Sequence, residues 1–370
     1  MYCMMTEDRA MPVPSVASAR PPVSIIIVTH NGMAYLINCL QSVSGELLDR
    51  DEVIIVDNRS SDGSPQFIRE CFPAVRVVEN QDNCGFAAAC NQGARLATGS
   101  ILIFLNQDTE VQPGWLCGLV KGLASKSSVG LTTSKHLLVT LPGKINLCGQ
   151  DIHYTGLSFM RGFMDDYQRY SEPERVGSVS GASFAIRREL WEQLGGFDQG
   201  LFMYYEETDL CWRARLAGYR SRYTPDSVLY HDYRPGQHSY ARLYYSRRNR
   251  AILLLKHWRW TTLLVLLPAL LVAELLDLGQ SALIAPFGLR AKLKAYLWVA
   301  THISDIMAAR REVQHMRTAR DWELLESCTS QVSLLELFGG NLMHFILAVT
   351  NGLFWLNYKA ACALCRALDI

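Results

Sequence analysis

The chain has 370 residues, of which 49% are hydrophobic and 19% charged, so it can bury one large or two modest cores and is not globally disordered. A formal net charge of +1 gives no reason to expect a nucleic-acid partner. The 11 cysteines are scattered and the Cys362-x-x-Cys365 pair is isolated, so free thiols in a reducing compartment are expected. Residues 1–21 lack the apolar segment of a secretory signal and predict a flexible tail.

Strands and helices alternate after this tail. The β-branched run VSIIIVT predicts a strand that ends before the turn pair Asn31-Gly32, and MAYLINCLQSV has apolar residues at helical spacing. In chain order, the expected elements are a strand at 23–29, a helix at 33–43, a strand at 53–56, a helix at 65–72, a strand at 75–80, a helix within 83–99 and a strand at 100–111. This alternation indicates βαβ units and a mostly parallel sheet.

Polar residues follow three of these strands. Residues 29–31 (Thr-His-Asn), residues 57–58 (Asp-Asn) and the stretch Asn106-x-Asp108 each come directly after an apolar run. Ligands of open α/β sheets bind beyond the carboxyl ends of the strands, where Asp108 can reach a metal ion or a phosphate. Asp and Asn are also common turn residues, but the repetition over three strands favours a ligand-binding edge.

A later helix is predicted to begin at Glu206 or Glu207 and to stop near Gly218. Glu206, Glu207 and Asp209 crowd its first turn, with aromatic residues just before them. Mutual repulsion can raise the pKa of such a carboxyl group towards a value useful in catalysis. The alternative is an ordinary helix start whose acids are solvated and complement the helix dipole.

Beyond residue 250 the chain becomes strongly apolar. The segments 261–289 and 334–358 approach the length of a membrane span, but Pro268, Glu274 and Asp277 interrupt the first. We expect helices that lie in or on one leaflet, and the alternative is a packed, soluble helical subdomain. A basic run before them suits an anionic cytoplasmic membrane face or the phosphates of a lipid carrier. This run consists of Arg234, Arg242, Arg247, Arg248, Arg250, Lys256 and Arg259.

The ordered set of motifs resembles glycosyltransferase family 2, the inverting nucleotide-sugar transferases, over residues 22–250. VSIIIVTHNG is similar to the first strand and nucleotide-contact turn of that family, and VIIVDNRSSDGS to the second strand, whose Asp addresses the base or ribose. NCGFAAACNQGARLATG resembles the glycine-asparagine segment of the rhamnosyltransferase-like branch. FLNQDTEV takes the place of the metal-binding Asp-x-Asp, and VLYHDYRPGQHS resembles the later histidine segment. One long segment of this chain resembles the acceptor-side block of the family, which contains the catalytic base. This segment is SGASFAIRRELWEQLGGFDQGLFMYYEETDLCWRARLAGY.

The resemblance implies a Rossmann-like α/β fold of the GT-A type with a mostly parallel sheet in residues 22–250. The apolar segments beyond it predict a helical, membrane-associated region in 251–370, where the likeness to the family is only in general apolar character. The resemblance also implies a divalent ion, Mg²⁺ or Mn²⁺, held by Asp108 and His231. Asn106 stands where the stricter motif has Asp, so metal binding would rely on Asp108 and the donor diphosphate. Glu207 takes the position of the catalytic base, which is commonly Asp.

The same resemblance divides the remaining site residues between donor and acceptor. The nucleotide-sugar side is expected to comprise Thr29, His30, Asn31, Asp57, Gly85, Asn91 and Asp108. The acceptor side is expected to comprise Gly181, Tyr205, Glu206 and Asp209. Arg248 and Asn249 are candidates for an acceptor phosphate, although a solvated helix face is an equal alternative.

The function expected from the resemblance is inverting transfer of a sugar from a nucleoside-diphosphate donor to a glycan or lipid-linked glycan in cell-surface polysaccharide synthesis. The rhamnosyltransferase-like segment favours dTDP-rhamnose as the donor. The enzyme is expected at the cytoplasmic face of the inner membrane, as a peripheral or monotopic protein. The alternatives are a polyprenyl-phosphate sugar transferase, whose anionic acceptor needs no base, and a non-catalytic nucleotide-sugar-binding protein.

Overall fold

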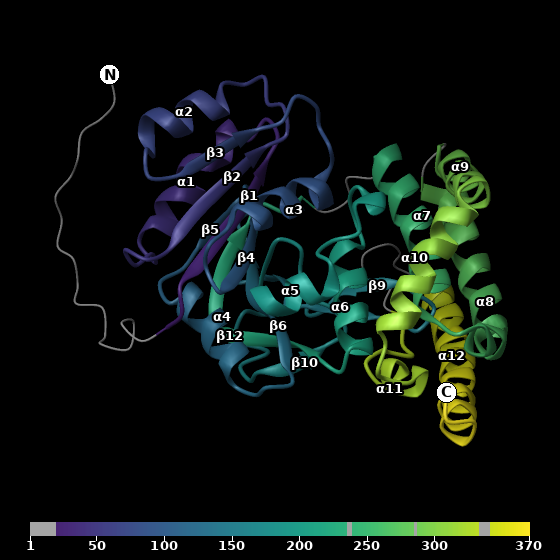
Figure 1. Ribbon diagram of the computed structural model, residues 1–370. Coiled ribbons are helices and arrows are strands. Elements are labelled where there is room, and N and C mark those ends of the chain that lie inside the picture. The colour runs from purple at the N-terminus through teal and green to yellow at the C-terminus, as the bar shows by residue number, and fades with distance from the viewer. Residues whose placement is uncertain (1–19, 235–238, 285–286, 333–340) are drawn as a thin grey trace.

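The computed structural model describes residues 20–234, 239–284, 287–332 and 341–370 (Figure 1). Its first part alternates strands and helices, as the sequence predicts. These are β1 (Val23–Thr29), α1 (Met33–Ser44), β2 (Glu52–Asp57), α2 (Ser64–Cys71), β3 (Arg76–Glu79), α3 (Phe86–Leu96) and β4 (Ile101–Asn106). The expected fourth strand is interrupted, because a turn at Gln107 and Asp108 separates β4 from β5 (Thr109–Val111). Asp108 therefore lies just beyond the carboxyl end of β4.

The irregular middle of the chain completes the sheet. Its elements are α4 (Trp115–Ala124), β6 (Val129–Leu138), β7 (Ile145–Leu147), β8 (Gln150–Ile152), β9 (Ser158–Met160), β10 (Glu174–Val176), β11 (Ser183–Arg187), α5 (Arg188–Leu194), the 3-10 helix η2 (Gln199–Leu201), α6 (Glu206–Leu216) and β12 (Arg220–His231). The strand order is β10-β12-β6-β11-β4-β1-β2-β3, and β8 pairs with β9 in a separate hairpin. Strands β1 to β4 pair in parallel, whereas β11 is antiparallel to both β4 and β6. The sheet is thus parallel in its first half and mixed in its second, with β4 at the junction.

Apolar layers cover both faces of the parallel half. Successive residues of a strand point to opposite faces, so Ile25 and Ile27 join the cluster under α1 and α4, while Ile26 joins the cluster that includes α3. Helix α3 comes close to the sheet because Gly93 has no side chain: a Cβ there would lie 2.5 Å from Cγ2 of Ile26. The parallel register places the carboxyl ends of β1, β2 and β4 side by side at one edge.

Six helices form the C-terminal part within the described residues. They are α7 (Tyr240–His257), α8 (Trp260–Ile284), α9 (Gly288–Thr301), α10 (Ile303–Met316), α11 (Asp321–Leu325) and α12 (Asn341–Ala367). The expected domain boundary at residue 250 falls inside α7. The expected tail up to residue 19, and residues 334–340 of the second apolar segment, lie outside the described residues.

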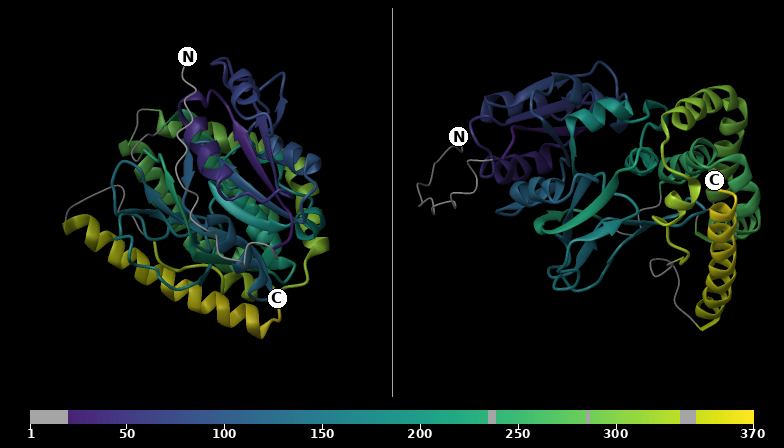
Figure 2. Two further views of the ribbon diagram at one scale, coloured as in Figure 1. Left: turned by 90° about the vertical axis from the view of Figure 1, so that its left-hand side faces the viewer. Right: turned by 60° about the horizontal axis from the view of Figure 1, so that its bottom comes forward.

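The helices pack directly on the sheet-containing part. Trp212 of α6 contacts Trp258 after α7, with ring centroids 5.2 Å apart. The hydroxyl of Tyr154, which lies between β8 and β9, donates a hydrogen bond of 2.9 Å to the carbonyl oxygen of Phe354 in α12. Figure 2 shows α12 running along one side of the molecule. The two parts therefore share a core, and a site between them has walls from both.

Most of the basic run before α8 is not at the surface, which corrects the expectation that the run as a whole forms a charged surface; Arg234 is exposed and Arg242 lines a cavity. Arg247, Arg250 and Lys256 are buried. Nη2 of Arg247 lies 3.0 Å from Oδ1 of Asp277, and Nη1 of Arg250 lies 2.6 Å from Oε1 of Glu274. Buried charges need such partners because they have lost their hydration. The acids that interrupt the apolar run of α8 are therefore the counter-ions of α7.

Helix α8 keeps an apolar face in solvent. Its segment Trp260–Gly279 is, among the described residues, the one helical segment long and apolar enough to cross a membrane by length and composition, with a mean hydropathy of 2.0. Leu264 is 71% exposed, Leu271 is 57% exposed and Leu275 is 69% exposed. These leucines recur at intervals of seven and four residues, so they lie along one side of the helix.

Candidate active site

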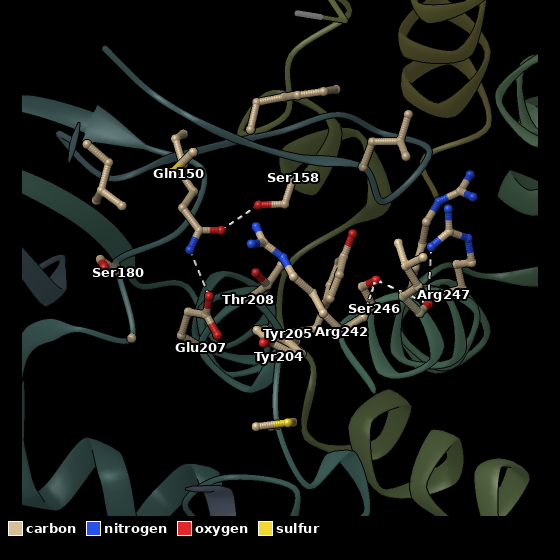
Figure 3. Close-up of a pocket in the computed structure, with 18 of the residues that line it drawn as sticks. Gln150, Ser158, Ser180, Tyr204, Tyr205, Glu207, Thr208, Arg242, Ser246 and Arg247 are labelled. Atoms are coloured by element: carbon tan, nitrogen blue, oxygen red, sulfur yellow. Dashed lines mark hydrogen bonds between the residues drawn. The ribbon is translucent and has the colours of Figure 1, made fainter. Parts of the chain in front are cut away.

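A cavity of about 720 Å³ opens where the β8–β9 hairpin, the start of α6, the end of β12 and helices α7 and α8 meet. Gln150, Glu207 and Arg242 point into the same space (Figure 3). The cavity is lined by several of the residues expected from the sequence. These are Asn106, Gly181, Tyr205, Glu206, Glu207 and His231. The structure thus brings Gly181, Tyr205 and Glu206 of the expected acceptor side together with the expected metal-side histidine.

Glu207 is held in the first turn of α6, which begins at Glu206 as the sequence predicts. Its Oε1 accepts a hydrogen bond of 2.7 Å from Nε2 of Gln150, so the side chain is fixed towards the cavity. Burial raises the pKa of Glu207, while the Gln150 hydrogen bond opposes the rise. Gly181 leaves the space beside the carboxyl open: a Cβ at that position would lie 3.8 Å from the Glu207 carboxyl group.

Glu206 is a buried acid with a different environment. Burial raises its pKa well above the ordinary value, and the neighbouring charge of Glu207 raises it further. Its Oε2 has no hydrogen-bond partner within the described part of the chain. Both features favour the protonated form, which leaves Glu207 as the better proton acceptor of the two.

An aromatic loop, residues 202–205, delivers these acids to the cavity in a strained conformation. Phe202, Tyr204 and Tyr205 have φ angles of 65°, 65° and 73°, in the left-handed region that non-glycine residues seldom adopt. Nδ2 of Asn249 lies 2.7–2.9 Å from the carbonyl oxygens of three residues in and before the loop, and Arg248 donates to two carbonyl oxygens of η2. A strained backbone of this kind is retained where surrounding contacts hold it in place, as the hydrogen bonds from Arg248 and Asn249 do here.

These contacts correct the expectation for α7. Arg248 and Asn249 are buried and bind backbone carbonyls, so they support the loop that carries the acids and do not meet an acceptor phosphate.

Asp209 is not an acceptor-side residue, which corrects the expectation from the acidic cluster. It is buried away from the cavity lining, where Nη2 of Arg213 and Nζ of Lys256 each lie 2.7 Å from its carboxylate oxygens. Burial alone would raise the pKa of Asp209, but the charges of Lys256 and Arg213 outweigh it and hold that pKa well below the ordinary value. Asp209 is therefore an ionised structural residue that joins α6 to α7.

The expected metal side is formed by β5 and β12. Antiparallel pairing places His231 opposite Thr109, next to the turn that carries Asp108. Nε2 of His231 lies 3.5 Å from Oδ1 of Asp108. Nδ1 of His231 lies 2.9 Å from Oδ1 of Asn146, an acceptor, so this contact orients the ring with Nε2 towards Asp108.

This pair fits a divalent ion that is also held by a bound diphosphate. Oδ1 of Asp108 is buried and has no hydrogen-bond partner among the described residues. A carboxylate oxygen and a neutral imidazole nitrogen are both good ligands for such ions. No group of three or more His, Cys, Asp or Glu side chains in the described ranges is placed to hold a metal ion. The remaining ligands would have to come from the donor and water.

The expected nucleotide side lies next to the cavity, at the carboxyl ends of β1 and β2. Oδ2 of Asp57 accepts a hydrogen bond of 2.8 Å from the Ser60 amide, whereas its Oδ1 is buried without a partner in the described chain. Nδ1 of His30 lies 2.9 Å from the carbonyl oxygen of Asn58, and Oδ1 of Asn31 accepts 2.9 Å from the Ser61 amide. These hydrogen bonds fix the turns at the carboxyl ends of β1 and β2. They leave Oδ1 of Asp57 without a hydrogen-bond partner within the described chain.

Thr29 connects the nucleotide side of the site to the metal side. Its hydroxyl donates a hydrogen bond of 2.6 Å to Oε1 of Gln107, the residue before Asp108. The donor-side turn and the metal-side turn are therefore tied to each other.

Gly85 and Asn91 serve the architecture of the site. Gly85 has φ of +84°, and a Cβ there would lie 2.5 Å from the ring of Phe202, so glycine lets the segment before α3 pass against the aromatic loop. Both ends of the Asn91 amide bind the backbone of Phe197, each at 2.8 Å. The structure does not bring Asn91 to the cavity, and its amide is fully used in positioning the segment that leads to α6.

Sequence reasoning missed Gln150, Asn146 and Arg242. The first two come from the β7–β8 region, whose strands are three residues long and show no readable periodicity. Arg242 was seen only as part of a basic run, although it lines the cavity. The one local signal at these strands was a polar residue on each, Asn146 and Gln150.

The sheet order and the site at its carboxyl edge define a nucleotide-sugar transferase fold of the GT-A type, as expected. Residues 24–195 match the family described as Glycosyl transferase family 2. This part of the chain is a glycosyltransferase family 2 domain.

Similar proteins agree with this assignment. An uncharacterized protein, y4gI, from Sinorhizobium fredii is 30% identical over 224 residues, covering 57% of this chain and 24% of that protein. An N-acetylglucosaminyl-diphospho-decaprenol L-rhamnosyltransferase from Mycobacterium tuberculosis is 26% identical over 231 residues, covering 56% of this chain and 75% of that protein. The crystal structure of GalNAc-T7 with UDP, GalNAc and Mn²⁺ has a TM-score of 0.53 at 21% identity, covering 64% of this chain and 49% of that one. The chain thus spans about a quarter of the first of these relatives and about half of the solved structure.

Proposed function

We propose that this protein is an inverting glycosyltransferase that moves a sugar from a nucleoside-diphosphate donor to a hydroxyl group of a glycan or lipid-linked glycan. The observation that carries the proposal is the position of Glu207. This half-buried carboxyl group, with a raised pKa, faces the same cavity as His231 and Asn106. A base and a leaving-group site that share one cavity are what this transfer needs.

The residues support a single displacement. The acceptor oxygen bonds to the anomeric carbon of the donor sugar as the bond from that carbon to the diphosphate oxygen breaks. Glu207 accepts the hydroxyl proton, and the diphosphate leaves with the electron pair. A divalent ion held by Asp108 and His231 would neutralise charge on the leaving group. Attack from the side of α6 inverts the anomeric centre.

For the donor we propose dTDP-rhamnose. The proposal is supported by the glycine-asparagine segment that contains Gly85 and Asn91, and by the similarity to the mycobacterial L-rhamnosyltransferase.

We also propose that the protein lies on the cytoplasmic face of the inner membrane through its C-terminal helices. Exposed leucines support this on three elements: Leu271 of α8 at 57%, Leu293 of α9 at 72% and Leu353 of α12 at 51%. Such contiguous apolar surface is costly in water and is a mark of interaction sites. The cysteines of the described chain are free thiols, which suits a reducing compartment.

A panel of nucleotide sugars tests the activity. Purified protein would be given dTDP-, UDP- and GDP-sugars with Mg²⁺ or Mn²⁺, with and without a detergent-solubilised lipid-linked glycan, and nucleoside diphosphate release would be measured. We expect release from one donor class that rises with acceptor and metal. No release from any donor under these conditions, by a folded protein that contains the intact cavity, would refute the proposal.

A further inference from the structure

A second cavity, of about 400 Å³, lies at the opposite end of β12 from His231. Its walls come from strands β8, β10 and β12, helix α6 and the segment that follows α11. Beside it, Nε of Arg215 in α6 donates a hydrogen bond of 3.1 Å to the carbonyl oxygen of Glu323 in α11. The cavity therefore lies at the junction between the sheet and the C-terminal helices. Its volume is in the range of pockets that hold small molecules, roughly 300–1,000 Å³.

Three arginines line this cavity, Arg175 of β10, Arg215 of α6 and Arg220 of β12. None of their guanidinium groups forms an ion pair with a carboxylate of the described residues, and those of Arg175 and Arg220 form no hydrogen bond there. Burial lowers the pKa of Arg215, and the charges of Arg220 and Arg175 lower it further. The charges of Glu323 and Glu326 oppose this shift. The three arginines therefore repel one another at a place that is partly withdrawn from water.

The two acids that line the same cavity, Asp151 and Glu326, do not balance these arginines. Oε1 of Glu326 lies 2.6 Å from Nη2 of Arg366 in α12, so its charge already has a partner. Burial raises the pKa of Asp151, so the fold does not favour its charge. Even with both acids ionised, the cavity keeps an excess of positive charge, which an anion would balance.

The rest of the lining combines hydroxyl groups with a small apolar area. The hydroxyl groups belong to Ser221, Ser327 and Thr329, and apolar side chains come from Ile152 and Val176. The planar fork of a guanidinium group matches the oxygens of a phosphate, and protein hydroxyl groups can exchange hydrogen bonds with the hydroxyl groups of a ligand. An inorganic ion would occupy a fraction of this volume, and a hydrocarbon chain would leave the arginines unpaired. The lining therefore fits a phosphate ester with a small polar body.

We propose that this second cavity binds a small organic phosphate, an ester whose polar body carries hydroxyl groups, with its phosphate between Arg175, Arg215 and Arg220. The ligand is neither the donor nor the acceptor of the proposed transfer. Arg215 lies two turns after Glu207 in α6, about 12 Å along the helix axis, so the bound phosphate does not meet the candidate base. Its partners are on β10, β12 and α6, beside the segment after α11, so binding stabilises the junction between the sheet and the C-terminal helices.

Calorimetric titration of ribose 5-phosphate into the full-length protein tests this site, with ribose and inorganic phosphate as single-feature probes. Salt at about 0.15 M screens attraction to exposed charges. We expect ribose 5-phosphate to bind at least tenfold more tightly than either probe, because its charge and its hydroxyl groups both find partners. The thermal midpoint should rise with it, since it binds the folded chain. Absence of binding, or equal binding of ribose or of inorganic phosphate, would overturn the proposal.

A matched set of variants on β10 and β12 locates the probe. Arg175→Gln and Arg220→Gln should each weaken ribose 5-phosphate binding by about tenfold or more, because each removes charged hydrogen bonds to the phosphate. Both variants should fold, since neither guanidinium group has a hydrogen-bond partner in the described chain. Arg222→Gln removes the same charge from β12 but lies outside the cavity lining, so binding should be unchanged. Equal losses in all three variants would mean general attraction to a basic surface and would overturn the site.

Competition separates this cavity from the candidate donor site. UDP with Mn²⁺ should not displace ribose 5-phosphate, and Asp108→Asn should bind ribose 5-phosphate as tightly as the wild type. Displacement by UDP, or loss of binding in Asp108→Asn, would place the probe at the donor side and overturn the proposal. These experiments measure no turnover, so failure of the proposed sugar transfer would leave the phosphate site standing, and loss of the phosphate site would leave sugar transfer untouched.

Discussion

In the mechanism that we propose, the carboxyl group of Glu207 accepts the proton of the acceptor hydroxyl. Its hydrogen bond to Gln150 sets the direction of the side chain, and burial sets its proton affinity. Glu207→Gln keeps the size and removes proton acceptance, so transfer to the acceptor should fall by roughly 10²–10⁴-fold, the usual range for loss of a general base. Donor binding should change little. The exposed Glu192→Gln on α5 is the control, and a near-normal rate in Glu207→Gln would show that the base lies elsewhere.

The pH dependence follows from the same group. A base must be deprotonated, and the pKa of Glu207 is raised above the ordinary 4.5. We therefore expect kcat/KM to fall with decreasing pH through a midpoint above that value. In Glu207→Gln the residual rate should lose this acidic limb. A midpoint at or below the ordinary value would mean that the environment of Glu207 does not control the reaction.

Asp108 makes a separate residue-scale prediction. Asp108→Asn should abolish the stimulation of nucleoside diphosphate release by Mg²⁺ or Mn²⁺ while leaving the thermal midpoint nearly unchanged. Its Oδ1 makes no hydrogen bond within the described residues that the substitution would remove, and Asn keeps the size of the side chain. Binding of Mn²⁺ in the presence of nucleoside diphosphate, followed by electron paramagnetic resonance, provides a readout besides activity. Full metal stimulation in this variant would contradict the assignment.

At the scale of elements, α6 is the piece that places the site. Its first turn presents Glu206 and Glu207 to the cavity, and Asp209 in the same turn ties the helix to Lys256 of α7. Asp209→Asn should lower the free energy of unfolding by about 3–5 kcal/mol, since it leaves Lys256 and Arg213 buried with less compensation. Denaturant unfolding measures this loss. Asp226→Asn, which removes an exposed ion pair with Lys121, should change it by about 0.5 kcal/mol or less.

The free energy of unfolding that Asp209→Asn removes should depend on pH, because the pKa of Asp209 is shifted in the folded protein. The folded-state pKa of Asp209 is depressed below the ordinary 3.8, so its stabilisation is present above the unfolded pKa and is lost as the pH falls towards the folded one. The difference between the wild type and Asp209→Asn should therefore be largest above about pH 4 and shrink in stronger acid. A difference that grows on acidification would show that the carboxylate is not ionised in the fold.

For the whole molecule, we propose that the C-terminal helices hold the catalytic domain on a membrane. Their exposed leucines predict that the protein cosediments with vesicles of anionic phospholipid without detergent. Leu271→Asp and Leu293→Asp should each weaken this binding by about tenfold, because each withdraws a leucine from the apolar contact. Val139→Asp, at an exposed position after β6, should have no effect. A wild-type protein that stays soluble at low salt with vesicles present would contradict the membrane proposal.

Local patterns were sufficient for much of this molecule. The runs that became β1, β2 and β4 are readable because a buried parallel strand is a continuous apolar segment, and the start of α6 is readable because acids favour a helix N-terminus. Glu207, Asp108 and His231 were predicted in this way or through the family resemblance, and their roles stay predictions. Each of these signals lies within a few neighbouring residues.

The sequence by itself therefore determined the βα units, the polar edge of the sheet and the apolar character of the last third of the chain. Tertiary structure alone decided which charged groups are free to act. In the sequence, Asp209 cannot be told apart from Glu206 and Glu207, but in the fold its carboxylate is ion-paired with Lys256, 47 residues away. Asn91 was expected to bind the donor, but in the fold its amide is hydrogen-bonded to the backbone of Phe197, 106 residues away. The physical reason is that burial and ion pairing depend on partners brought together by folding, and no local pattern specifies them.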